Sequence, residues 1–211
     1  MAYRRTERES ARLIARHEAI IRAARAFASE GGLAAVQIAG VAERAGVAAG
    51  TVYRYFPSKE HLVAAVIRDA ADRQVAAIRA AAAAAPGTLS GLAAAVVAFA
   101  AGILRTRRLA FAVLLEAGTE ADGLTAARRR ITGEFEVLIR AAAAAGHVPE
   151  QPYAATAAAL CGAMVEGLAV LAFPGPDDGR AAVRDMALLA LRAVGVPDPR
   201  ARGLVLAAGV P

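Results

Sequence analysis

The sequence predicts an all-helical protein with a small N-terminal domain and a larger C-terminal one. The 211 residues include no tryptophan and only 5% aromatic residues, and alanine runs that favour helices recur at 80–85 and 141–145. No stretch suggests a sheet. From residue 36 to residue 62, apolar residues recur with the spacing of two short helices joined by a tight turn.

The charge is uneven along the chain. Residues 1–60 hold ten Lys and Arg against six Asp and Glu, whereas residues 61–211 hold fifteen against thirteen, within a formal net charge of +6. This distribution favours a polyanionic partner for the N-terminal part. The single cysteine, Cys161, allows no intramolecular disulfide and fits a reducing cytoplasm. The charged start MAYRRTERES does not fit a signal peptide.

The first segment, residues 1–16, is rich in arginine. Two interpretations stand: a solvated helical extension, or an arm that reaches DNA phosphates or the minor groove. A helix is expected from Ile20, with an apolar face that includes Phe27, and Gly31 and Gly32 end it. The arginines of the segment are Arg4, Arg5, Arg8, Arg12 and Arg16.

The next two helices are short. Apolar residues at the spacing i, i+3, i+4 and i+7 predict the first one; they are Ile38, Val41, Ala42 and Ala45. Gly46 suits the left-handed backbone that stops a helix, and a second helix follows over about 48–55. Pro57 ends it, and Ser58 is a good N-cap for the next helix.

This segment resembles the DNA-binding signature of the TetR family of bacterial transcriptional regulators. The resemblance runs from about residue 20 to residue 66 and is carried by the run Gly46-Val47, Thr51, Tyr53, Tyr55-Phe56 and Lys59-Glu60. It implies a homodimer on a palindromic operator, with one recognition helix in each of two successive major grooves. It also implies a repressor in which a ligand of the larger domain changes the separation of these helices.

The expected DNA contacts divide by role. Thr51 and Arg54 are placed for base edges or phosphates, and the tyrosine hydroxyls for phosphates. Lys59, the only lysine, stands at a helix N-terminus that attracts phosphate. The full set is Gln37, Arg44, Thr51, Tyr53, Arg54, Tyr55 and Lys59. Arg44 is equally compatible with a surface charge, and Tyr53 with core packing.

The segment has small apolar residues at several positions where the family commonly has polar or basic residues that contact DNA. Ala48-Ala49 stand where the family commonly has a capping Ser or Thr and then a polar residue, and Ala39-Gly40 replace residues that are usually polar or basic. We therefore expect specificity to depend on Thr51, Tyr53, Arg54 and the N-terminal arginines, or on DNA shape. The departures also support an alternative function: a helical small-molecule-binding or scaffolding protein that no longer reads specific DNA.

The C-terminal part is expected to hold further helices, long ones over about 58–85, 88–105, 122–146, 152–171 and 180–194, and short ones over 109–116 and 199–208. The helices at about 152–171 and 180–194 carry more apolar surface than a small bundle covers, which predicts homodimerisation through them. The stretch 153–173 is long enough to span a bilayer, but Glu166 and its alanine content favour a buried soluble helix.

An effector pocket is expected between these helices, for a largely apolar or amphipathic molecule. Ordinary core packing is the alternative for each of its residues. The apolar candidates are Phe99, Ile103, Phe111, Leu115, Phe135 and Met164, and the polar anchors are Glu116 or Glu166.

Nothing in the sequence supports catalysis. The three histidines, His17, His61 and His147, lack a metal-type partner four residues on, and no GxSxG, P-loop or Rossmann glycine pattern occurs. We therefore expect no enzyme, no metal and no cofactor, in a cytoplasmic protein without a membrane span. The expected organisation is an extension over 1–16, a DNA-binding domain over 17–62 and a ligand-binding and dimerisation domain over 63–211.

Overall fold

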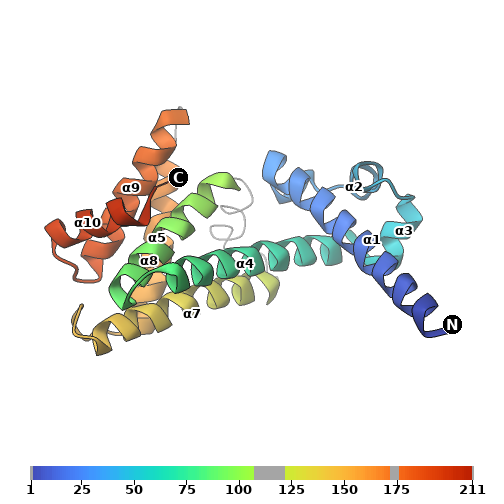
Figure 1. Ribbon diagram of the computed structural model, residues 1–211. Coiled ribbons are helices and arrows are strands. Elements are labelled where there is room, and N and C mark those ends of the chain that lie inside the picture. Colours follow the sequence, from blue (N-terminus) through green and yellow to red (C-terminus); the bar gives the residue numbers. More distant parts are fainter. Residues whose placement is uncertain (1, 107–121, 172–175, 211) are drawn as a thin grey trace. The chain divides into compact units, whose positions relative to one another are not determined.

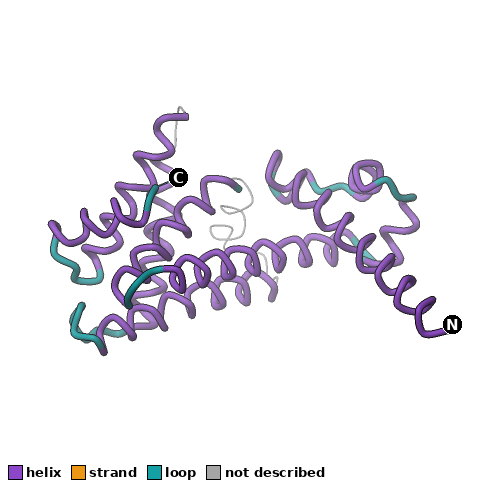
Figure 2. Tube along the Cα trace, viewed as in Figure 1, coloured by secondary structure: helices purple, strands orange, loops and turns teal. Residues whose placement is uncertain are grey.

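The computed structural model describes residues 2–106, 122–171 and 176–210. Within these ranges every regular element is a helix, which confirms the predicted fold class (Figures 1 and 2). The chain forms two compact units, Met1–Ala70 and Ala71–Pro211. The boundary lies inside one long helix, α4 (Lys59–Ala84), which contributes residues to both units.

The first unit holds α1 to α3 and the start of α4. Its elements are α1 (Ala2–Gly31), the 3₁₀ turn η1 (Leu33–Ala35), α2 (Ile38–Ala45) and α3 (Ala49–Tyr55). The helices α1, α2, α3 and α4 each contribute fully buried side chains to the core of this unit, among them Ile20, Val41, Val52 and Leu62. An ion pair between Arg25 and Asp69, 2.8 Å long, adds a link between α1 and α4.

The turn between α2 and α3 is formed as the sequence predicts. Gly46 adopts the left-handed conformation, with φ 67° and ψ 35°. The backbone N–H of Val47 donates to the carbonyl of Ala42 at 3.0 Å, which satisfies one of the free carbonyls at the end of α2. Ser58 also acts as predicted, since its hydroxyl accepts a hydrogen bond from the His61 N–H at 3.4 Å.

The second unit is organised around α5 (Thr88–Arg105), which is buried on most of its sides and contacts each of the other helices that begin in this unit. These are α7 (Asp122–Ala144), α8 (Tyr153–Leu171), α9 (Pro176–Ala193) and α10 (Asp198–Ala208). At its centre Phe99 and Phe135 meet edge to face, with ring centroids 5.3 Å apart. The helix expected at 109–116 lies outside the described residues.

Two helices have the length and apolar composition of a membrane span, Thr88–Arg105 and the segment Tyr153–Val170 of α8. The first has 67% of its residues buried inside the protein, as expected for a core helix. The second has only 33% buried. Its solvent-facing side consists mostly of small residues and includes Val170, which is 71% exposed.

Candidate nucleic-acid interface

The exposed side of α3 presents polar side chains in succession. Val52 is fully buried and anchors the helix, whereas Tyr53 is 52% exposed, Arg54 is exposed and Thr51 is half-buried. The guanidinium carbon of Arg54 lies 5.9 Å from the centroid of the Tyr55 ring. The packing of Val52 therefore fixes which face of α3 remains available for a partner.

Two other predicted contacts converge on one backbone carbonyl, that of Ala34. The Gln37 side-chain amide, just before α2, donates to it at 3.1 Å, and the Lys59 ammonium, at the start of α4, donates to it at 3.5 Å. The sequence separates these two residues by more than twenty positions, yet the structure places both beside the free N–H groups of helix N-termini. A donor pair with a net positive charge at this point suits a phosphate group.

The start of α4 also carries an acidic group. The hydroxyl of Ser58 donates to the Glu60 carboxylate at 2.5 Å, and this hydrogen bond lowers the pKa of Glu60. Because Glu60 is exposed and stays ionised at neutral pH, it partly offsets the charge of the neighbouring Lys59.

Arg44 is already engaged within the first unit. Its guanidinium donates to both carboxylate oxygens of Glu30, at 2.8 and 3.1 Å, and lies 3.8 Å from the centroid of the Phe27 ring. This bidentate pair neutralises the charge and holds the side chain against α1. Gly40 belongs to the same cluster, since a Cβ there would lie 3.1 Å from the Phe27 ring. The contact with the Phe27 ring therefore explains why position 40 has no side chain.

Tyr55 links α3 to the N-terminal part of α1. Its hydroxyl donates to the Leu13 carbonyl at 3.3 Å, and the His17 ring lies against Tyr55 and Phe56, with centroid distances of 6.1 and 5.2 Å. Sequence reasoning missed Leu13 and His17, because partners so far apart in the chain leave no local signal.

The segment 2–16 is helical and continuous with the rest of α1. Its described arginines, Arg12 and Arg16, are exposed. The side chains of Arg4, Arg5 and Arg8 lie outside the description. A helical extension with exposed arginines is compatible with both interpretations of this segment, a solvated surface or an arm on DNA.

In the second unit the apolar residues predicted for an effector pocket lie in the core. Phe99, Ile103, Phe135 and Met164 are buried together. Glu166, in contrast, is exposed on α8, so it does not accompany them. The other three predicted pocket residues, Phe111, Leu115 and Glu116, lie outside the described residues.

One polar residue near this core was missed from the sequence. The side-chain nitrogen of Gln74, on α4, is buried and has no hydrogen-bond acceptor. Its amide lies directly over Gly102 of α5, where a Cβ would stand only 2.2 Å from the Gln74 oxygen. An unsatisfied buried amide is energetically costly.

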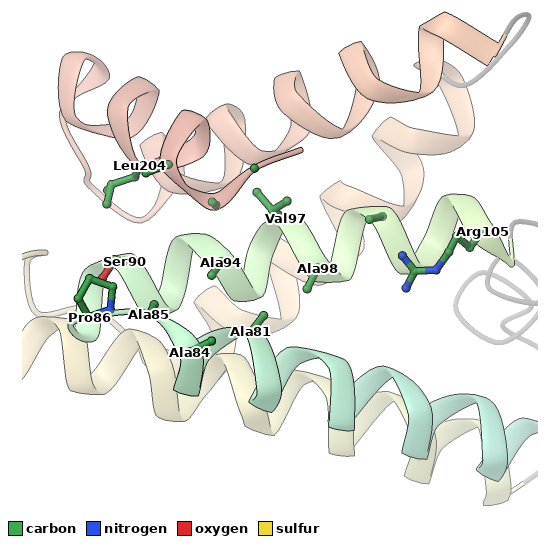
Figure 3. Close-up of a pocket in the computed structure, with 14 residues that line it drawn as sticks. Ala81, Ala84, Ala85, Pro86, Ser90, Ala94, Val97, Ala98, Arg105 and Leu204 are labelled. Carbon is green, nitrogen blue, oxygen red and sulfur yellow. The ribbon is translucent and has the colours of Figure 1, made fainter. Parts of the chain in front are cut away.

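Two grooves of the second unit reach the surface on either side of α10. The one in Figure 3 has a volume of about 510 Å³ and lies among α4, α5 and α10. Its walls are mostly alanine, with Ser90 and Pro86 at one end and Arg105 at the other (Figure 3). The second groove lies between α9 and α10. Among the described residues, no group of three or more His, Cys, Asp and Glu is placed to hold a metal ion.

Comparison with known proteins identifies the first unit. Residues 20–66 match the family model described as bacterial regulatory proteins, tetR family. The chain is 56% identical over 52 residues to the HTH-type transcriptional repressor KstR of Mycolicibacterium smegmatis and to that of Rhodococcus jostii. The match covers 25% of this chain and spans about a quarter of each relative, 26% and 24%.

Solved structures match over nearly the whole chain. TylP, a TetR regulator from Streptomyces fradiae, is 26% identical with a TM-score of 0.70, over 90% of this chain and 92% of that one. A TetR-family regulatory protein from Rhodococcus RHA1 is 25% identical with a TM-score of 0.67, over 87% and 98%. RolR in complex with resorcinol shares the fold at 23% identity, with a TM-score of 0.67 over 96% of both chains.

These relatives are transcriptional regulators rather than enzymes, in line with the sequence. The signature in α2 and α3, the match of residues 20–66 and the shared fold of the whole chain agree with one another. Residues 20–66 therefore carry the sequence of the tetR family of bacterial regulatory proteins, and the chain shares the fold of TetR regulators over most of its length.

Proposed function

We propose that this protein is a homodimeric repressor that binds a palindromic DNA operator and releases it when a small effector binds the second unit. The observation that carries the proposal is the surface of the first unit. There the exposed side chains of α3 occur together with the donor pair of Gln37 and Lys59. Both are suited to the phosphates and base edges of a major groove.

The proposed contacts follow the geometry. Thr51, Tyr53 and Arg54 meet the major groove, while Gln37 and Lys59 together bind one phosphate. Arg44, in contrast, is engaged by Glu30 and contributes no charge to DNA. Tyr55 acts chiefly by holding the N-terminal part of α1 through the Leu13 carbonyl, and in doing so positions the N-terminal arginines as an arm.

The proposed dimer forms through α8 and α9. The exposed side of α8 offers Ala155, Ala159 and Gly162, which allow close approach of another helix, and Val170 lies further along. On α9, Leu189 is also exposed. Burying this apolar surface against a second copy removes it from water.

The proposed effector site is the interior around the Phe99–Phe135 pair and Met164. These side chains suit a largely apolar molecule, and the free Gln74 amide suits a hydrogen-bond acceptor on it.

If Gln74 binds a ligand, its side-chain nitrogen lacks a hydrogen bond in the ligand-free protein, which lowers the stability of that state. We expect Gln74→Leu to raise the free energy of unfolding of the ligand-free protein by about 1–3 kcal/mol, measured by urea denaturation. A decrease would show that the amide supports the fold instead.

DNA binding is tested directly with the purified full chain. A pool of random-sequence duplexes is selected for binding, and the enriched duplex is compared with a scrambled one by fluorescence anisotropy. We expect a palindromic consensus with half-sites about 34 Å apart and at least about 10³-fold preference over the scrambled duplex. Equal binding of the two duplexes contradicts the proposal and favours a helical binding protein that does not read sequence.

A further inference from the structure

A groove of about 690 Å³ lies between α9 and α10, away from the residues discussed above. Its volume falls in the range of roughly 300–1,000 Å³ that is common for small-molecule sites. The floor is apolar: Leu188 and Val205 are buried, and Leu206 extends it although it is 83% exposed. Three arginines also line the groove: Arg180, Arg184 and Arg202.

These arginines are only partly neutralised. Arg202 donates to Asp198 of its own helix at 2.9 Å, and Arg184 donates to the adjacent Asp185 at 3.0 Å. Arg180 forms no ion pair or hydrogen bond with any residue that the structure describes. The groove therefore combines an apolar floor with an excess of positive charge, which complements an anion.

The placement of two arginines along α9 favours one end of the groove for an anionic group. Arg180 and Arg184 are four residues apart, so they lie on the same face one turn from each other. Leu188 follows on the next turn, about 12 Å along the helix from Arg180. Two guanidinium groups and then an apolar floor match a molecule with a charged head and an aliphatic chain.

We propose that this groove binds a single-chain amphipathic carboxylate. Its head lies between Arg180 and Arg184, and its aliphatic chain covers Leu188, Val205 and Leu206. Binding there removes the exposed Leu206 side chain from water, which the protein alone does not achieve. The proposal does not depend on DNA binding. Among the described residues that line the groove of Figure 3, the charged one is Arg105, so no such cluster is found there.

The first test is calorimetric titration of the full chain with dodecanoate below its micellar concentration. Acetate supplies the head group alone, and dodecyltrimethylammonium supplies the same chain with the opposite charge. We expect dodecanoate to bind at least about tenfold more tightly than either control. Equal binding of acetate would reduce the site to simple anion attraction, and equal binding of the cation would show that the arginines play no part.

Variants locate the binding site. Leu206→Glu introduces a negative charge at an exposed position, and the double substitution Arg180→Gln with Arg184→Gln removes the proposed head-group contacts. We expect each to weaken dodecanoate binding at least about tenfold, while the matched control Arg105→Gln stays within about twofold. Unchanged binding in both groove variants would place dodecanoate in the interior of the bundle and overturn the proposal.

A second copy of the chain is the other possible occupant of the groove, and sedimentation velocity distinguishes it. We expect Leu206→Glu to leave the sedimentation coefficient of the ligand-free protein unchanged. A shift of this variant towards a smaller species would show that the groove is a contact between copies, which contradicts ligand binding there. Circular dichroism of each variant confirms that the helices are retained, since the substituted side chains are solvent-accessible.

Discussion

Lys59 and Arg44 are both at least partly exposed to solvent, but their environments predict that only the substitution of Lys59 weakens DNA binding. Among the described residues, the Lys59 ammonium has one hydrogen-bond acceptor, the Ala34 carbonyl at 3.5 Å, which an incoming phosphate can replace. The Arg44 guanidinium is held by both oxygens of Glu30. We therefore expect Lys59→Gln to remove a phosphate contact, whereas Arg44→Gln removes none.

The magnitude follows from counterion release. Each phosphate contact contributes about 0.9 to the slope of log K against log salt concentration, and a dimer has two copies of Lys59. Lys59→Gln should therefore reduce the slope by about 1.8. For a fourfold change in salt, from about 50 to about 200 mM, the wild type then loses roughly twelvefold more affinity than the variant does.

The assay is fluorescence anisotropy of the enriched duplex across this range of salt, with wild type, Lys59→Gln and Arg44→Gln measured in parallel. The reasoning is refuted if Lys59→Gln leaves the slope unchanged. It is equally refuted if Arg44→Gln reduces the slope by as much. That result would show that Arg44 contacts a phosphate in spite of its ion pair with Glu30.

Three further predictions concern the folded state. Gly46→Ala should lower the free energy of unfolding by about 1–2 kcal/mol, measured by urea denaturation, because φ is 67° there while a Cβ meets no atom within 4 Å. Tyr55→Phe should cost about 0.5–1.5 kcal/mol and speed amide exchange around Leu13, since the hydrogen bond to that carbonyl is lost. Burial raises the pKa of the Cys161 thiol to about 12, so iodoacetamide at neutral pH should label it only after unfolding. The stability associated with this protonated thiol should fall as the pH rises from about 9 towards 12.

The helices and the α2–α3 turn could be predicted because their signals are local. Gly46 ends α2 and Ser58 caps α4 through contacts within a few residues of their own positions. The spacing of apolar residues around Val41 indicates which face of α2 is buried. The tail helix was predicted over 199–208 and is found over Asp198–Ala208 for the same reason.

The candidate site was less predictable, because its details depend on contacts between distant segments. The sequence identified Arg44 as a possible DNA contact, but it gave no sign of Glu30 and Phe27 beside it. The buried amide of Gln74 and the α9–α10 groove likewise arise from packing between helices. Periodicity reports which face of a helix is apolar, but not which neighbour covers it.

The Phe27 and Gly40 pair has a consequence for how this surface can change during evolution. A side chain at position 40 can be accommodated only if the ring at position 27, 3.1 Å from the would-be Cβ, shifts slightly. A smaller residue at position 27 would in turn remove the stacking surface under the Arg44 guanidinium. A larger residue at position 40 therefore requires an adjustment of the Phe27 ring, whereas the exposed residues of α3 can change one at a time.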